Sequence, residues 1–272
     1  RKNLQVFGEM DLLRPGEVDE CLRNITLCGT LAELCSGAQL VIEAVSEKLD
    51  LKRSIFLDLE RLCLPEAILC SNTSGICIGD ICAPMNSKAR VLGTHFWNPP
   101  HVMACVEIIK SPFTSPDVFE TVVEIMRRIG KEPIRVLKDV PGFLGNRLQH
   151  ALWREAISLV EKGIAEPEDI DRVVKHGFGL RLSFIGPFET ADLAGLDLAR
   201  DVHDYLLREL DTSSGPSPVL LKKIEEGSLG VKTGKGFYTW TPEEIQALIR
   251  NRDKAFLRII QAVKKSRAEM AG

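Results

Sequence analysis

The chain has 272 residues and a formal net charge of −3, and 44% of its residues are hydrophobic against 27% that are charged. This is the composition of an ordinary globular protein, long enough for one large domain or two smaller ones. The small negative charge argues against nucleic acid or an anionic membrane as the main partner, and no apolar run approaches the roughly 18 residues that a membrane span needs.

Short apolar runs alternate with amphipathic segments through the first half of the chain. The apolar runs have the length and turn boundaries of buried strands, and the segments between them have helical spacing. Such alternation predicts an α/β domain with a mostly parallel sheet covered on both faces. The predicted strands are residues 40–45, 67–70, 90–95, 105–109 and 132–137, and the predicted helices are residues 50–63, 78–81 and one that begins at Ser115.

The second half of the chain has a different pattern, in which long helical segments follow one another. The predicted helices are residues 143–162, 167–175, 189–210 and 218–226, with one or two more over 243–270. We therefore expect an α/β domain over residues 1–139 and an all-α domain over residues 140–272.

Eight cysteines lie within the first 105 residues. No Cys-x-x-Cys pair occurs among them, and the histidines show no metal-ligand spacing, so no metal site is predicted. A chain of this length is also unlike a small secreted disulfide scaffold. We interpret the cysteines as buried apolar residues of a protein in the reducing cytoplasm.

One histidine and one glutamate form the main candidate for acid–base chemistry. In open α/β sheets ligands bind beyond the carboxyl ends of the strands, and His95 ends a predicted strand. Imidazole titrates near neutral pH, so it can carry a proton during a reaction. Glu107 lies inside an apolar strand, where a carboxylate is costly unless it is paired. A His95–Glu107 pair satisfies both residues; the alternative is an exposed Glu107 on an edge strand and a purely structural His95.

Several neutral polar residues also follow the strands or lie near the domain boundary. Ser74, Asn98 and Asn146 could bind a substrate oxygen or a cofactor amide, although such residues also serve as turn and cap residues. No Gly-x-Gly-x-x-Gly and no other phosphate-binding loop occurs in the chain. Spacing alone therefore leaves the cofactor open.

Six segments of the chain together resemble one family, the L-3-hydroxyacyl-CoA dehydrogenases. They occur in a single order and span nearly the whole chain. The segments are Glu43–Glu47, Ser71–Ser74, His95–Pro99, Val106–Ile109, Asp139–Arg147 and Lys232–Tyr238.

The resemblance implies a Rossmann-type NAD domain followed by a helical domain for substrate binding and homodimer formation. It implies NAD-dependent oxidation of L-3-hydroxyacyl-CoA to 3-oxoacyl-CoA, as in fatty acid or butanoate metabolism. His95 would then be the general acid/base and Glu107 its orienting partner. Ser74 and Asn146 would hold the reacting oxygen, and the cofactor would be contacted by Glu47, Lys52, Ser74, Asn98 and Lys232.

Two departures from the family pattern leave alternatives open. The family begins with a strand, a glycine-rich turn, a helix and a second strand, whereas Glu17–Leu31 resembles a later helix and strand. We therefore expect the first strand and the glycine-rich loop to be missing from this sequence. Trp97–Pro100 and Gly179–Ser183 are closer to carnitine dehydrogenase and to the lambda-crystallin type of L-gulonate dehydrogenase. The alternatives are a dehydrogenase of a free small hydroxy acid and an inactive binding module without the dinucleotide loop.

Overall fold

The computed structural model describes residues 2–9, 13–14 and 16–271. The chain divides into two compact units, residues 1–146 and residues 147–272, and the division falls inside α7 (Gly145–Glu161). The boundary expected between residues 139 and 140 lies a few residues earlier. The segment between these two points is bonded to the first unit, because the N–H of Gly142 donates to the carbonyl of Gly75 at 3.4 Å.

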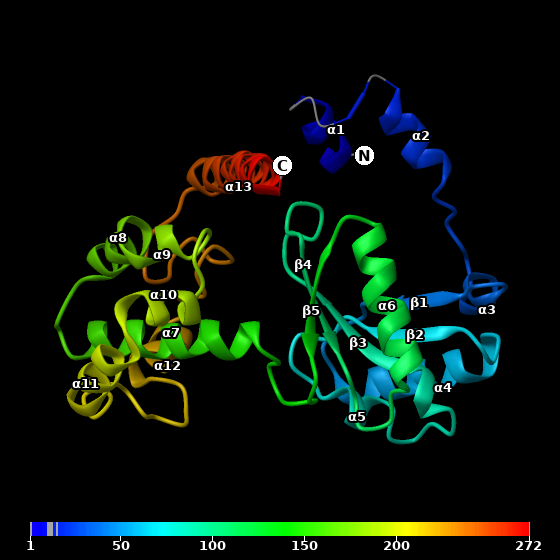
Figure 1. Cartoon of the computed structure of the whole chain (residues 1–272), viewed down its shortest axis with the longest axis horizontal. Helices are drawn as coiled ribbons and strands as arrows, with labels where there is room; N and C mark the ends of the chain where they lie inside the picture. The colour runs from blue at the N-terminus through cyan, green and yellow to red at the C-terminus, as the bar shows by residue number, and fades with distance from the viewer. Residues whose placement is uncertain (1, 10–12, 15, 272) are drawn as a thin grey trace. The chain divides into compact units, whose positions relative to one another are not determined.

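The first unit is built on a five-stranded sheet whose strands follow one another in chain order (Figure 1). The strands pair in parallel except for β3 with β4, so the predicted mostly parallel sheet is confirmed. The loop between β3 and β4 is too short for a crossover connection, which forces the antiparallel pairing. The strands are β1 (Leu40–Glu43), β2 (Ile68–Ser71), β3 (Val91–Phe96), β4 (Cys105–Ile109) and β5 (Glu132–Val136).

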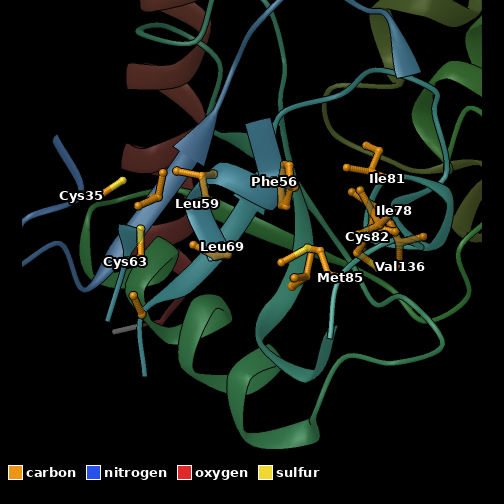
Figure 2. Close-up of a cluster of buried hydrophobic side chains, with 14 of the residues drawn as sticks. Cys35, Phe56, Leu59, Cys63, Leu69, Ile78, Ile81, Cys82, Met85 and Val136 are labelled. Carbon is orange, nitrogen blue, oxygen red and sulfur yellow. The ribbon is translucent and has the colours of Figure 1, made fainter. Parts of the chain in front are cut away.

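Helices cover both faces of this sheet, as predicted. The helices α4 (Leu49–Leu62) and α5 (Ile78–Ile81) pack on one face, where Phe56 and Leu69 are buried (Figure 2). The helix α6 (Pro116–Arg128) packs on the other face. Its start follows the expected pattern, because the Ser115 hydroxyl accepts the Val118 N–H at 3.3 Å.

The segment before the sheet differs from the prediction. It forms α1 (Lys2–Glu9), α2 (Glu17–Arg23) and α3 (Leu31–Cys35). The strand expected within Glu17–Leu31 is wrong: residues 24–30 pair with no described strand, and Leu27 is 93% exposed. A strand needs a neighbour for its backbone hydrogen bonds, and no described strand lies beside this segment. Instead Thr30 and Glu33 form a capping box that starts α3.

The second unit is helical, with one difference from the predicted elements. The single helix expected over residues 189–210 is wrong, because Gly195 adopts φ 96°, outside the helical region, and breaks it in two. Beyond α7, the helices are α8 (Pro167–His176), α9 (Phe178–Arg181), α10 (Pro187–Ala194), α11 (Leu196–Leu206), α12 (Pro218–Glu225) and α13 (Pro242–Ala271).

The helical unit buries very little of its own apolar surface. Among its described residues only Ser158 and Leu257 are buried, whereas Phe188 is 85% exposed. Both clusters of buried hydrophobic residues lie in the first unit. The second unit therefore leaves many of its large apolar side chains exposed in the single chain, among them Phe184, Phe188 and Leu193. None of the helices in the described residues is both long and apolar enough to span a membrane.

Candidate active site

The two acid–base candidates lie opposite each other on the antiparallel strands β3 and β4. The pairing register places His95 directly across from Glu107, and side chains opposite each other across a strand pair point to the same face. Nδ1 of His95 lies 2.8 Å from Oε2 of Glu107, and the residues are 7% and 1% exposed. The predicted contact is confirmed.

The Glu107 carboxylate accepts hydrogen bonds on both oxygens. Oε2 accepts from His95 and, at 3.2 Å, from the Trp97 indole N–H; Oε1 accepts the backbone N–H groups of Leu144 and Gly145 at 2.9 and 3.0 Å. Burial by itself raises the pKa of Glu107, but these hydrogen bonds outweigh burial and leave the pKa below its usual value. Glu107 is therefore ionised at neutral pH.

A tight turn before α7 aims the two backbone donors at Glu107. Gly142 and Phe143 both have positive φ, 75° and 52°, and Phe143 is fully buried. The left-handed conformation of a non-glycine residue costs on the order of 1–3 kcal/mol. The Phe143 ring packs 5.8 Å from the His95 ring, so the strained turn also supports the imidazole.

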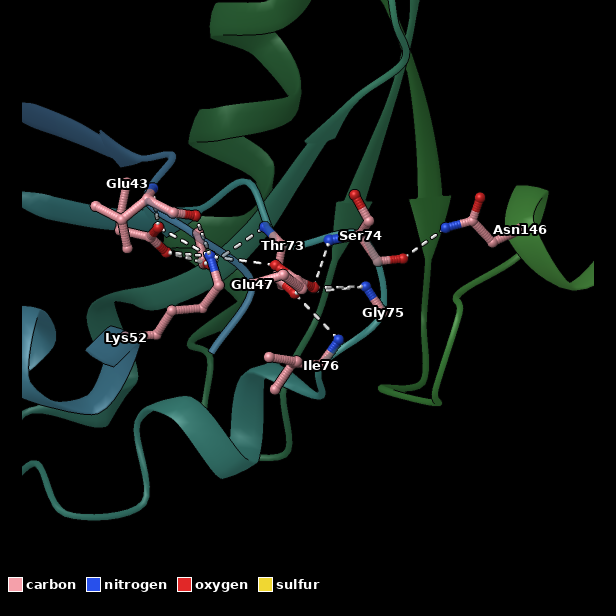
Figure 3. A network of polar contacts seen from close by, with 10 residues as sticks. Glu43, Glu47, Lys52, Thr73, Ser74, Gly75, Ile76 and Asn146 are labelled. Carbon is pink, nitrogen blue, oxygen red and sulfur yellow. Dashed lines mark hydrogen bonds and ion pairs between the residues drawn. The ribbon is translucent and has the colours of Figure 1, made fainter. Parts of the chain in front are cut away.

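A buried ion-pair network joins the carboxyl ends of β1 and β2 to α4 (Figure 3). Nζ of Lys52 lies 2.9 and 3.2 Å from the two carboxylate oxygens of Glu43 and 3.4 Å from Oε2 of Glu47. The Ser71 hydroxyl donates to Glu43 at 2.7 Å. The Lys52 side chain is 1% exposed, so its charge is compensated by these carboxylates and not by solvent.

Glu47 holds the loop that follows β2. Its Oε1 accepts the Thr73 hydroxyl at 2.5 Å and the backbone N–H groups of Ser74 and Gly75 at 3.0 and 3.2 Å. Partial burial raises the pKa of Glu47. The Thr73 hydroxyl, the charge of Lys52 and the Ser74 N–H lower the pKa by more than burial raises it, so the net shift is downward. An ionised Glu47 thus fixes the loop that carries Ser74.

The structure brings the two oxygen-binding candidates together. The amide Nδ2 of Asn146 donates to the backbone carbonyl of Ser74 at 2.6 Å (Figure 3). Ser74 and Asn98 are exposed beyond the carboxyl ends of β2 and β3. Lys232 is exposed on the second unit, between α12 and α13. The roles assigned to these residues stay predictions.

Three residues of the site were missed by the sequence reasoning: Glu43, Trp97 and Phe143. Glu43 could have been found by the argument used for Glu107, since it too is an acid in an apolar strand. Trp97 follows His95 by two residues, a spacing that in an extended chain places both side chains on one face. Lys52, assigned to the cofactor, has its ammonium enclosed by Glu43, Glu47 and the Val45 carbonyl.

The exposed groups at this edge fit a nicotinamide cofactor. The Ser74 hydroxyl, the Asn98 amide and the half-exposed Glu47 carboxylate supply the hydrogen-bonding groups that a carboxamide and a ribose need. They lie beyond the carboxyl ends of the strands, where α/β sheets bind dinucleotides. An α/β sheet followed by a helical unit, with a buried imidazole–carboxylate pair at the sheet edge, matches the class of two-domain nicotinamide-dependent dehydrogenases.

The family within this class follows from comparison with known proteins. Residues 1–140 match the NAD binding domain of 3-hydroxyacyl-CoA dehydrogenase, and residues 142–240 match its C-terminal domain. The chain therefore belongs to the 3-hydroxyacyl-CoA dehydrogenase family, and it is an enzyme that uses NAD.

Individual relatives differ in the substrates that their names give. A probable 3-hydroxybutyryl-CoA dehydrogenase of Bacillus subtilis is 39% identical over 241 residues, 88% of this chain and 82% of the relative. The 5-formyl-3-hydroxy-2-methylpyridine 4-carboxylate 5-dehydrogenase of Mesorhizobium japonicum is 37% identical over 229 residues, 84% of this chain and 74% of the relative. A crystal structure of an enzyme of that same name, an NAD⁺-dependent dismutase, has a TM-score of 0.84 at 36% identity and covers 86% of this chain and 76% of that one.

Proposed function

We propose that this protein oxidises the 3-hydroxyl group of L-3-hydroxyacyl-CoA to the 3-oxo group, with His95 as general base. The observation that carries the proposal is the buried 2.8 Å contact between His95 and an ionised Glu107 at the carboxyl edge of the sheet. A histidine held in this way is oriented, and its protonated form has a counter-charge.

The tautomer of His95 follows from its partner. Because Nδ1–H is committed to Glu107, the neutral imidazole carries its lone pair on Nε2. NAD, when bound, accepts the hydride from the carbon that bears the hydroxyl. Nε2 takes the hydroxyl proton, Glu107 stabilises the imidazolium, and Ser74 and Asn146 hold the oxygen on which charge develops. In the reverse direction the same imidazolium returns the proton.

A second candidate substrate is a free small acid without CoA. The similarity to the pyridine-carboxylate dehydrogenase and the sequence Trp97–Pro100 favour it. The test compares kcat/KM with NAD for five substrates: 3-hydroxybutyryl-CoA, free 3-hydroxybutyrate, carnitine, L-gulonate and 5-formyl-3-hydroxy-2-methylpyridine 4-carboxylate. We expect the value for 3-hydroxybutyryl-CoA to be higher than the others by on the order of 100-fold. The reason is that the binding energy of the remote CoA group stabilises the transition state. A higher value for any free acid would assign the protein to the second candidate.

The pairing of His95 with Glu107 predicts a pH effect. The lowered pKa of Glu107 keeps it charged across the neutral range, where it favours the imidazolium. Glu107→Gln removes this charge, so the base loses its proton more easily and the acid limb of the pH profile for oxidation moves to lower pH. The measurement is kcat/KM against pH at saturating NAD. An unchanged limb would contradict the pairing.

We also propose a homodimer formed through the helical unit, whose apolar surface is exposed in the single chain. Light scattering is expected to give twice the chain mass of 30.2 kDa. A charge placed in this surface, Phe188→Glu, should shift the protein towards the monomer, because burying an unpaired carboxylate is costly. Leu137→Glu, at an exposed apolar residue of the first unit, is the control. A monomer at micromolar concentration would contradict the proposal.

The thiols agree with a reducing compartment, and we place the enzyme in the cytoplasm. All eight cysteines are unpaired. Burial raises the pKa of Cys70 to about 12 and that of Cys82 to about 11, which keeps both thiols protonated and unreactive.

A further inference from the structure

Two N–H groups donate to the same oxygen of the Glu107 carboxylate. Nδ1 of His95 lies 2.8 Å from Oε2, and Nε1 of Trp97 lies 3.2 Å from the same atom. The two rings are neighbours, with centroids 6.0 Å apart. We propose that Trp97 is a positioning residue of the proposed dehydrogenase reaction: its indole N–H holds Oε2 in place and weakens the attraction of that oxygen for the protonated His95.

The second donor affects the charge on Oε2 because Glu107 is closed off from water. It is 1% exposed, so solvent does not replace a lost donor. The two donors on Oε1 come from the backbone of Leu144 and Gly145 and are present whatever the side chain at position 97. Within the part of the chain that the structure describes, the indole N–H is thus the one side-chain donor, besides His95 itself, that reduces the negative charge on Oε2.

The start of α7 is shaped to receive the indole. A Cβ atom on Gly145 would lie 2.0 Å from Cζ2 of Trp97, far inside van der Waals contact. Gly145 has no positive φ, so alanine is compatible with its backbone conformation. An alanine at this position therefore acts on the indole by its volume.

No other charged side chain hydrogen-bonds to Glu107 in the described residues. Its remaining partners are His95 and Trp97 from the β3 end and the backbone at the start of α7. A further titratable group affected by the charge of Glu107 is Cys105 on β4. Burial and the charges of Glu107 and Glu132 raise the pKa of Cys105 to about 11, so this thiol stays neutral through the pH range of the test.

The test is the pH dependence of kcat/KM for oxidation in the full chain with NAD, using the fastest substrate of the panel above. Trp97→Phe keeps an aromatic ring and removes the N–H. We expect the acid limb to move to higher pH by about half a unit, opposite to the shift in Glu107→Gln, because Oε2 then attracts the imidazolium more strongly. Trp153→Phe, which removes an indole on the second unit, should leave the limb unchanged.

A second route to the same change uses Gly145. Gly145→Ala displaces the indole and should also move the limb upwards. In Trp97→Phe/Gly145→Ala the methyl group fills the space that the larger ring left, and no additional shift is expected. The proposal would be overturned if the acid limb of the pH profile stays in place or moves to lower pH in both Trp97→Phe and Gly145→Ala. It would also be overturned if these variants lose kcat while the pH dependence of kcat/KM stays unchanged. Full turnover in His95→Ala would instead overturn the proposed function itself.

Discussion

We expect His95→Ala to lower kcat for oxidation by about 10²–10⁴-fold, the usual contribution of a general base. The affinity for NADH should stay near that of the wild type. In the proposed mechanism the imidazole acts on the substrate proton, and the groups that fit the cofactor belong to other residues, Glu47, Ser74 and Asn98. The measurements are steady-state kinetics and a fluorescence titration with NADH.

The control for His95→Ala is the loss of an imidazole elsewhere. His203 is exposed on α11, and His203→Ala should keep wild-type turnover. Thermal unfolding shows whether the His95 variant keeps its fold, since the ring also packs against Phe143. Two outcomes would mean that the role of His95 is misassigned. One is wild-type turnover in the His95 variant. The other is a variant that binds NADH poorly but turns over normally once the cofactor is bound.

The elements from β1 to β5 were predictable because their hydrophobic pattern is strong. A carboxylate inside the apolar strand Cys105–Ile109 required a buried partner, and the His95 imidazole was the available one. What the sequence lacked was the pairing register. A sheet of uniform direction would not have placed residues 95 and 107 opposite each other, and the short β3–β4 connection is what does so.

Other features of the site depend on backbone geometry or on burial that local sequence does not reveal. The positive φ of Phe143 is exceptional for a bulky residue and has no sequence signature. Gly195 lies in a helical pattern, where glycine is often tolerated, yet here it ends a helix. Lys52 occupies an ordinary helical position, and lysine is rarely buried, so its enclosure by two carboxylates follows only from the tertiary structure.

We expect Lys52→Met to lower the free energy of unfolding by about 3–5 kcal/mol, the cost of breaking a buried ion pair. Methionine replaces the volume of the stem but leaves the Glu43 carboxylate, 1% exposed, without its cation. Glu47 loses its charge partner as well, so the loop that carries Ser74 should become less ordered. Urea unfolding followed by circular dichroism gives the free energy.

Two further variants show whether the loss of stability in Lys52→Met comes from the buried charge that it leaves or from the loss of any ion-paired basic residue. Glu43→Gln/Lys52→Met removes both charges and should recover part of the stability, because an uncompensated carboxylate is the larger cost. Arg127→Met removes an exposed ion pair with Glu124 on α6 and should change the free energy by less than about 1 kcal/mol. If Lys52→Met is no less stable than Arg127→Met, the network is not an ionised buried pair. If Lys52→Met unfolds easily but the double variant recovers nothing, an uncompensated Glu43 carboxylate is not the cause of the loss.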